Sequence, residues 1–334
     1  MADLRNLITD VPGVRVGSAG DTRLASGVTA VVFDEPAIGS IDVRGGGPGT
    51  RETALLDPAQ TVQGIDGIVL SGGSAFGLEA AAGVQAWLRE QGRGFAVGSA
   101  RVPIVPGAIL FDLLNGGDKD WGRYPPYREL GYEASAGAGL DFALGSAGAG
   151  LGATTVNLKG GLGSASATCD GYTVGALAAV NAAGSVIFGD GPWFWAAAFE
   201  RDSEYGGLGL PTKLPQGALA AATKANPRAS TTLAVVATDA TLTKAQAKRL
   251  AVMAQTGLAR AIYPVHTPLD GDVVFAVSTG RKPLADATLG LTALGTVAAN
   301  CLARAVARGV YEATALPFAE ALPSWRDRFG HGAR

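Results

Sequence analysis

Residues 226–239 read Asn-Pro-Arg-Ala-Ser-Thr-Thr-Leu-Ala-Val-Val-Ala-Thr-Asp. The Asn-Pro pair indicates a turn, and the β-branched, apolar run at 231–237 has the length of a buried strand. Thr231 and Thr232 are therefore expected where a loop enters a sheet. Such a place suits a nucleophile, because the loop gives access and the strand fixes the geometry. Threonines also begin ordinary strands, so this pattern leaves both interpretations open.

Composition indicates a large core with few charges. Of the 334 residues, 47% are apolar and 17% are charged, whereas charged residues usually make up about 25%. The 49 glycines have no period of three and indicate a compact α/β protein with many tight turns. The net charge of −2, without a basic run, argues against nucleic acid as a partner.

Cysteine and histidine are scarce, which limits the possible chemistry. Cys169 and Cys301 make neither a disulfide framework nor a metal cluster, and we expect no metal or other cofactor. With only His266 and His331, a hydrolase needs another base or depends on His266 alone. The chain starts without a signal-peptide core and has no apolar run long enough to span a membrane. We therefore expect a cytoplasmic protein without a membrane partner.

Short apolar runs and amphipathic stretches predict alternating strands and helices. We expect strands at 14–16, 27–33, 40–44, 66–70, 172–180, 231–237 and 273–278, and helices from the 71–77 turn to about 91, at 243–262 and at 286–308. Residues 181–184 are expected to turn a hairpin with Asn181 at the bend and 185–188 as its return. Residues 118–133 are expected to form a surface loop.

Two glycine-rich segments suggest ligand sites. Gly148–Ala153 matches the pattern G-x-G-x-x-A, but the β-branched residues that follow argue against the helix that a dinucleotide site needs. Gly72, Gly73 and Ser74 are expected to open a helix and to present backbone N–H groups to an anion or oxyanion. A plain helix cap by Ser74 is the alternative.

Charged and amide side chains supply further candidates. Asp270 and Asp272 lie two residues apart at a strand entry, where like charges on one face raise each other's pKa and suit proton transfer. A solvated turn is the alternative. Lys159 precedes two glycines that permit close backbone approach, and Asn181 is expected to offer an amide donor, unless it only serves a turn.

Together these segments resemble the DmpA aminopeptidase family (P1 peptidases), which includes L-aminopeptidase/D-esterases, β-peptidyl aminopeptidases and nylon-oligomer hydrolases. The resemblance covers nearly the whole chain and is carried by residues 42–50 (DVRGGGPGT), 71–78 (SGGSAFGL), 158–161 (LKGG) and 235–239 (VVATD). It implies one domain over residues 1–334 with a four-layer αββα sandwich, like that of DmpA and ornithine acetyltransferase. It also implies a homo-oligomer, similar to a tetramer.

The resemblance implies a mechanism as well. Family members cut their own chain before a Ser or Thr, which then becomes an amino-terminal nucleophile. Here that residue is Thr231, the bond is Ser230–Thr231, and the products are 1–230 and 231–334. The new α-amine, with a pKa of about 7.7–8, would accept the hydroxyl proton near neutral pH.

The resemblance also implies roles for other residues. Asp270 and Asp272 would orient Thr231, and Asn181 would donate to the oxyanion. The remaining predicted site residues are Lys159 as a catalytic residue and Gly73, Ser74 and Phe111 as substrate contacts. Three positions depart from the family pattern: Ser230 replaces Gly or Asn, Phe111 replaces a tyrosine found in some members, and Asn157 replaces a lysine of the nylon-hydrolase branch.

The sequence thus predicts a self-processing hydrolase of amide bonds, an aminopeptidase or amidase that acts on small peptides or amino-acid amides. Two alternatives remain. One is an acyltransferase resembling ornithine acetyltransferase, which also uses a threonine as nucleophile. The other is a non-catalytic binding protein of the same fold.

Overall fold

A computed structural model describes residues 4–224 and 230–330. The strands are β1 (Val14–Asp21), β2 (Ser26–Val43), β3 (Gly49–Arg51), β4 (Gly64–Ser71), β5 (Phe95–Val97), β6 (Ala100–Val102), β7 (Gly107–Ile109), β8 (Gly161–Cys169), β9 (Tyr172–Asn181), β10 (Thr231–Thr241) and β11 (Val273–Pro283). The α-helices are α1 (Ala80–Glu90), α2 (Tyr127–Ala136), α3 (Lys244–Ala259), α4 (Leu289–Tyr311) and α5 (Trp325–Phe329). The 3-10 helices are η1 (Ile8–Asp10), η2 (Ala54–Leu56), η3 (Ser74–Glu79), η4 (Gly148–Gly150) and η5 (Trp195–Phe199).

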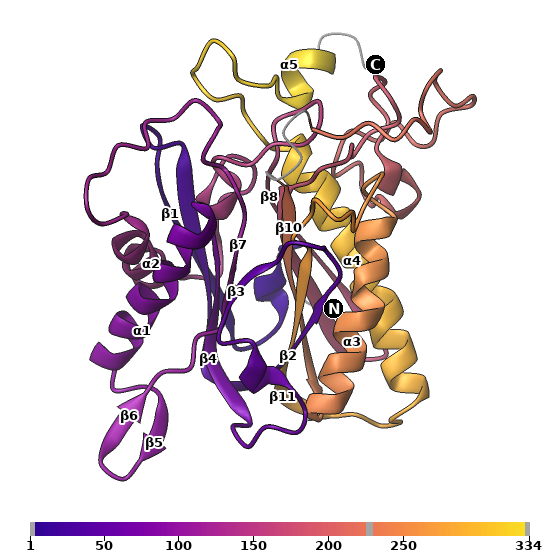
Figure 1. The fold of residues 1–334 in the computed structure, drawn as a ribbon. Helices are drawn as coiled ribbons and strands as arrows, with labels where there is room; N and C mark the ends of the chain where they lie inside the picture. Colours follow the sequence, from indigo (N-terminus) through magenta and orange to yellow (C-terminus); the bar gives the residue numbers. More distant parts are fainter. Residues whose placement is uncertain (1–3, 225–229, 331–334) are drawn as a thin grey trace.

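The long strand β2 belongs to two stacked layers of sheet. Residues 26–33 pair antiparallel with β1, and residues 28–32 also pair with β4. Residues 37 and 38 pair with β4 as well, and residues 38–43 pair with β11. The hydrogen-bonded order β3-β7-β4-β2-β11-β10-β9-β8 therefore passes from one layer to the other through β2. Figure 1 shows α1 and α2 outside the first layer and α3 and α4 outside the second.

Alternation along the strands divides the apolar side chains among three cores. In β10, Leu233 and Val235 point into the core between the two sheet layers, whereas Ala234 and Val236 point toward α3 and α4. In β2, Val31 faces the inner core and its neighbours face α1 and α2. Among the described residues, the three largest cores lie between four layers, which confirms the predicted αββα sandwich.

Several predicted elements are correct and others need correction. The strands at β4, β9, β10 and β11 and the helices α3 and α4 are confirmed. The two strands predicted at 27–33 and 40–44 are one strand, β2, and the predicted loop at 118–133 contains most of α2. The predicted hairpin after Asn181 does not form: Ser185 bridges to Tyr263 and Ile187 to Phe194. The neighbours of β9 in the sheet are β8 and β10.

The carboxy-terminal helix α4 lies along the outer face of the second sheet layer. Its length and hydropathy alone would allow it to cross a membrane, but 61% of its apolar window is buried in the structure. Leu294, Ala298, Leu302 and Val306 of α4 pack into the core beneath the sheet. We interpret it as a core helix, which passes the same test of length and composition.

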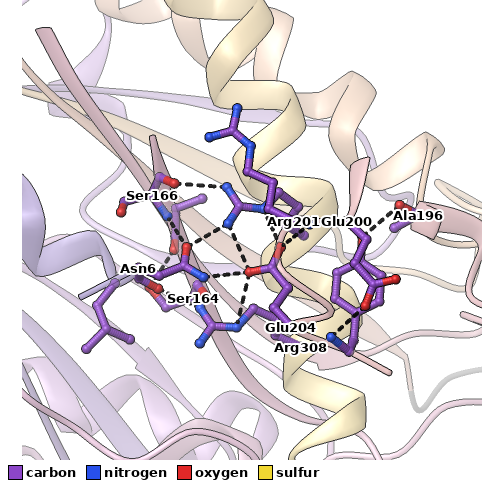
Figure 2. Close-up of polar contacts among 12 residues, drawn as sticks. Asn6, Ser164, Ser166, Ala196, Glu200, Arg201, Glu204 and Arg308 are labelled. Atoms are coloured by element: carbon purple, nitrogen blue, oxygen red, sulfur yellow. Dashed lines mark hydrogen bonds and ion pairs between the residues drawn. The ribbon is translucent and has the colours of Figure 1, made fainter. Parts of the chain in front are cut away.

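A buried ion-pair cluster joins α4 to the segment at 200–205 and to the amino-terminal end of the described chain (Figure 2). Glu204 accepts from Arg304 Nη2 at 2.9 Å and lies 3.6 Å from Arg308 Nε. Asn6 accepts from Arg304 Nη2 at 2.7 Å and donates to Glu204 at 2.6 Å. Because each charge has a partner, the cluster can be buried without an isolated ion.

Candidate active site

Thr231 and Asn181 face each other at one end of the sheet. Thr231 begins β10 and Asn181 ends the antiparallel strand β9, and the two residues are direct partners in the strand register. Leu233 and Ala179, two residues along each strand, belong to the inner core. By strand alternation, the side chains of Thr231 and Asn181 therefore point toward the gap between the two sheet layers. The cross-strand pair brings the predicted nucleophile and the predicted oxyanion donor together. The preceding Asn226-Pro227 turn lies outside the described residues.

The acidic loop at 270–272 lies directly against the start of β10. Ser230 forms a parallel bridge with Asp270, and the Asp272 Oδ1 accepts from the Thr232 amide at 2.7 Å. Asp270 turns the other way and accepts from the Ala183 amide at 3.0 Å. The two carboxylates do not share one face as predicted, because β11 starts only at Val273. Instead, their hydrogen bonds attach the loop to Thr232 on one side and to Ala183 on the other.

Burial and charge shift the proton affinity of this loop. Burial raises the pKa of the Asp270 carboxyl, and the neighbouring Asp272 charge raises it further. Hydrogen bonds from Thr267 oppose this shift, with Thr267 Oγ1 donating to Asp270 Oδ2 at 2.7 Å. The predicted mutual effect of the two acids is therefore present at Asp270.

The glycine turn at 45–47 is hydrogen-bonded to the backbone of the acidic loop at 270–272. The amide of Gly47 donates to the Asp270 carbonyl at 2.8 Å, and the amide of Gly45 donates to the Asp272 carbonyl at 3.3 Å. A Cβ added at Gly45 would overlap the Asp272 nitrogen and the Asp270 carbonyl oxygen. Glycine is needed at 45 because two backbones approach this closely.

The carbonyl of Ser230, which belongs to the predicted cleavage bond, accepts two hydrogen bonds. The Thr231 hydroxyl donates to it at 2.5 Å, and the Gly271 amide donates to it at 3.0 Å. Ser230 is 3% exposed and Thr231 is 4% exposed. The hydroxyl and the amide thus meet at one buried carbonyl.

His266 is a site residue whose role was not assigned from the sequence. Its ring Nδ1 lies 2.8 Å from Asp272 Oδ2, and its backbone amide donates to the same oxygen at 3.2 Å. The backbone of His266 has a φ of 54°, which is uncommon for a residue other than glycine. In the sequence, it could have been noticed as the histidine that lies close to Asp270 and Asp272.

Lys159 is buried and fully engaged with backbone carbonyls. Its Nζ donates to Gly150 and Ala153 at 2.9 Å each and to Gly160 at 2.8 Å. Burial lowers its pKa to about 7, while the Asp112 charge acts in the opposite direction. The three carbonyls match the three donors of an ammonium, and a catalytic role of Lys159 stays a prediction.

A cavity of about 330 Å³ is lined by Lys159 and by Lys224, which contacts Asn181, whereas Thr231 is not among its lining residues. Phe111, predicted to contact the substrate, lies in its wall, and its carbonyl accepts from Asn181 Nδ2 at 2.9 Å. Lys159 and Lys224 contribute amino groups to the lining, and Leu316, Phe318 and Leu322 contribute its apolar part. The arrangement can admit a molecule with both apolar and polar groups.

Lys224 and Asp112 are two members of this cavity that sequence reasoning missed. Lys224 Nζ donates to Asn181 Oδ1 at 3.0 Å, and burial lowers its pKa to about 7. No local pattern marks Lys224 in its long loop. Asp112 accepts from the Ser26 hydroxyl at 2.6 Å, and burial raises its pKa. In the sequence, Asp112 could have been noticed as an acidic residue inside the apolar run 109–114.

The amides at 72–74 do not form the predicted oxyanion site. Gly72 donates to the Gly27 carbonyl and Ser74 to the Leu110 carbonyl, each at 2.9 Å. Gly73 donates to the Asp112 carboxylate at 2.8 Å. All three N–H groups are therefore satisfied within the protein. Ser74 has a φ of 52° and makes no helix cap, so the α-helix starts only at Ala80. Contact of Gly73 and Ser74 with a substrate stays a prediction.

The model of the family described as "Peptidase family S58" matches residues 6–321. The chain is a member of peptidase family S58. An uncharacterized aminopeptidase of Mycobacterium bovis is 46% identical over 347 aligned positions, which cover 97% of this chain and 98% of the relative. A 6-aminohexanoate-oligomer endohydrolase of Kocuria sp. is 27% identical and covers 89% of this chain and 84% of its own.

Two solved structures share the fold of this chain. A β-aminopeptidase of Burkholderia sp. matches with a TM-score of 0.71 at 22% identity, covering 98% of this chain and 92% of that chain. The L-aminopeptidase D-Ala-esterase/amidase of Ochrobactrum anthropi, described as a variant of the Ntn hydrolase fold, has a TM-score of 0.69 at 21% identity, covering 97% and 91%. The S58 member described here is a hydrolase of amide bonds.

Proposed function

We propose that the protein is a self-processing aminopeptidase or amidase whose nucleophile is Thr231. The observation that carries the proposal is the hydrogen bond from the Thr231 hydroxyl to the carbonyl of Ser230, 2.5 Å away. The same hydroxyl stands opposite Asn181 in the register and beside the acidic loop. This hydrogen bond keeps the hydroxyl beside the peptide bond that it would attack, and such proximity favours an intramolecular reaction.

Cleavage before Thr231 leaves its α-amine free. That amine, with an ordinary pKa of about 7.7–8.0, takes the hydroxyl proton when a substrate carbonyl is attacked. Asn181 lies opposite and is suited to stabilise the oxyanion of the substrate. Asp272 holds the Thr232 amide and thereby the start of β10.

The cavity supports small substrates that combine an apolar part with an amide. Its volume of about 330 Å³ admits an amino-acid amide or a short peptide. The names of similar proteins suggest which amides to test first: peptides with a free amino terminus, and 6-aminohexanoate oligomers.

Two isosteric variants test the nucleophile. Thr231→Val and Thr232→Val each remove one hydroxyl from adjacent buried residues, and the Thr232 hydroxyl has no hydrogen-bond partner among the described residues. We expect Thr231→Val to abolish self-cleavage and hydrolysis of amino-acid p-nitroanilides, and Thr232→Val to retain both. Equal activity in the two variants would contradict the assignment.

A second assay distinguishes the hydrolase from the main alternative, an acyltransferase. The wild-type protein is incubated with acetyl-ornithine and glutamate, and acetyl-glutamate is measured. Acyl transfer to glutamate without hydrolysis of amides would favour the acyltransferase over the hydrolase.

A further inference from the structure

We infer that the backbone N–H of Gly271 is the oxyanion donor for cleavage of the Ser230–Thr231 bond. This inference rests on the proposed function. It names the group that acts while the chain is still intact, before the α-amine of Thr231 exists.

The Ser230 carbonyl oxygen is the atom on which negative charge develops. The Gly271 nitrogen lies 3.0 Å from it, within the range for an oxyanion donor. Ser230 is buried at 3% exposure, so solvent contributes little to the stabilisation of this oxygen. A fixed N–H in such an environment acts more strongly than the same group in water.

The loop that carries this amide is held in place on both sides. Asp270 binds the Ala183 amide beyond the end of β9, and Asp272 binds the Thr232 amide in β10. The amide of residue 271 therefore has little freedom to turn away from Ser230. In this role the two aspartates are positioning residues for the donor.

The residue between the two aspartates must also be small. A Cβ added at Gly271 would lie 2.7 Å from Thr231 Oγ1 and 2.8 Å from the Gly47 carbonyl oxygen. Real Cβ atoms do not approach neighbours this closely, and the displaced neighbour would include the attacking hydroxyl. Glycine alone lets the N–H reach the carbonyl while the hydroxyl keeps its position.

The chemistry of the step is an acyl shift followed by hydrolysis. The Thr231 oxygen forms a bond to the Ser230 carbonyl carbon, and the charge on the carbonyl oxygen is stabilised by the Gly271 N–H. Collapse of this tetrahedral intermediate breaks the bond between the carbonyl carbon and the Thr231 nitrogen, and the nitrogen takes up the proton that the hydroxyl has lost. Water then hydrolyses the ester, which gives a carboxylic acid on Ser230 and a free hydroxyl and amine on Thr231.

Replacing the amide of Gly271 by an ester tests this directly. Full-length protein is made by cell-free translation, with a suppressor tRNA carrying glycolic acid at position 271, so that one N–H becomes an oxygen. The matched control carries the same change at Gly92, an exposed residue at the end of α1 whose amide donates to Arg89 at 2.9 Å. Mild alkali, which cuts esters, verifies incorporation at each site.

We expect the ester at 271 to slow self-cleavage by about 10²–10³-fold, the usual effect of removing one oxyanion donor. The control at 92 should cleave at the wild-type rate, and thermal unfolding of both proteins shows that they are folded. An ester at 271 that cleaves as fast as the control would overturn the inference.

The result is distinguishable from failure of the proposed function. If the wild-type chain cleaves before Thr231 but the ester at 271 has no effect, the nucleophile stands and the donor is another group. If the wild-type chain is never cleaved, the proposed function and this inference both fail.

Discussion

The Asp272 carboxylate joins Thr232 to His266: one oxygen accepts from the Thr232 amide at 2.7 Å, and the other lies 2.8 Å from the His266 ring. Thr232 directly follows the proposed nucleophile. This side chain therefore connects the first residues of β10 to the loop that ends at β11. Removing or reorienting it should disturb the site more than its size suggests.

Asp272→Asn tests this connection. The amide side chain keeps the shape but presents its NH2 group to one of the two backbone N–H groups, those of Thr232 and His266, that already donate to the carboxylate. We expect the free energy of unfolding to fall by about 1–3 kcal/mol and self-cleavage to slow at least about tenfold. Denaturant titration and a cleavage time course measure the two effects. Asp141→Asn, at a side chain 81% exposed, is the control and should change little. Wild-type cleavage in Asp272→Asn would show that this carboxylate does not position Thr231.

Gly45→Ala tests the support beneath the acidic loop. The new Cβ would overlap the backbone of Asp270 and Asp272. Overpacking of this kind costs about 1–3 kcal/mol, and the displaced loop should also slow self-cleavage. Gly47→Ala is the control in the same turn, because its Cβ would meet its nearest atom only at 3.9 Å. Equal destabilisation of the two variants, measured by urea denaturation, would refute the steric explanation.

Lys159→Met tests the proton affinity of the buried lysine. The folded chain holds its pKa at about 7, below the ordinary 10.5. Between these values the unfolded chain binds a proton that the folded chain has released, so the stability of the wild type rises with pH. Relative to Lys159→Met, which lacks the group, the wild type should gain stability as the pH rises above about 7. A difference in unfolding free energy that stays constant from about pH 7 to 10 would contradict the shift.

Arg304→Met tests the buried ion-pair cluster of Figure 2. The substitution leaves Glu204, 7% exposed, without its main partner, and such losses cost about 3–5 kcal/mol. The double variant Arg304→Met/Glu204→Leu should recover part of this stability because no buried charge is orphaned. The control Arg326→Met breaks an exposed pair with Glu312 and should cost less than about 1 kcal/mol. A control that costs as much as Arg304→Met would argue against burial as the cause.

Local sequence patterns predicted the features that depend on local chemistry. The β-branched, apolar run at 231–237 indicated β10, and the stretch at 243–262 indicated α3. The resemblance grouped Thr231, Asn181 and the acidic pair, and the register of β9 and β10 confirms that they lie together.

Features that depend on contacts distant in sequence were not accessible in this way. The hairpin predicted after Asn181 was wrong because β9 takes its second partner, β10, from far along the chain. The amides at 72–74 looked like an anion site because the acceptor Asp112 lies in a different segment. Lys224 approaches Asn181 only through the fold, and the Gly271 amide meets Ser230 only once both strand ends are paired.

The intact mass of purified wild-type protein under denaturing conditions tests the assignment of Thr231 most directly. We predict two polypeptides, residues 1–230 and residues 231–334, the second with a free amino-terminal threonine. Thr231→Val prepared in parallel should remain a single chain. A wild-type chain that stays whole after prolonged incubation, or one cut at any other bond, would contradict Thr231 as the nucleophile.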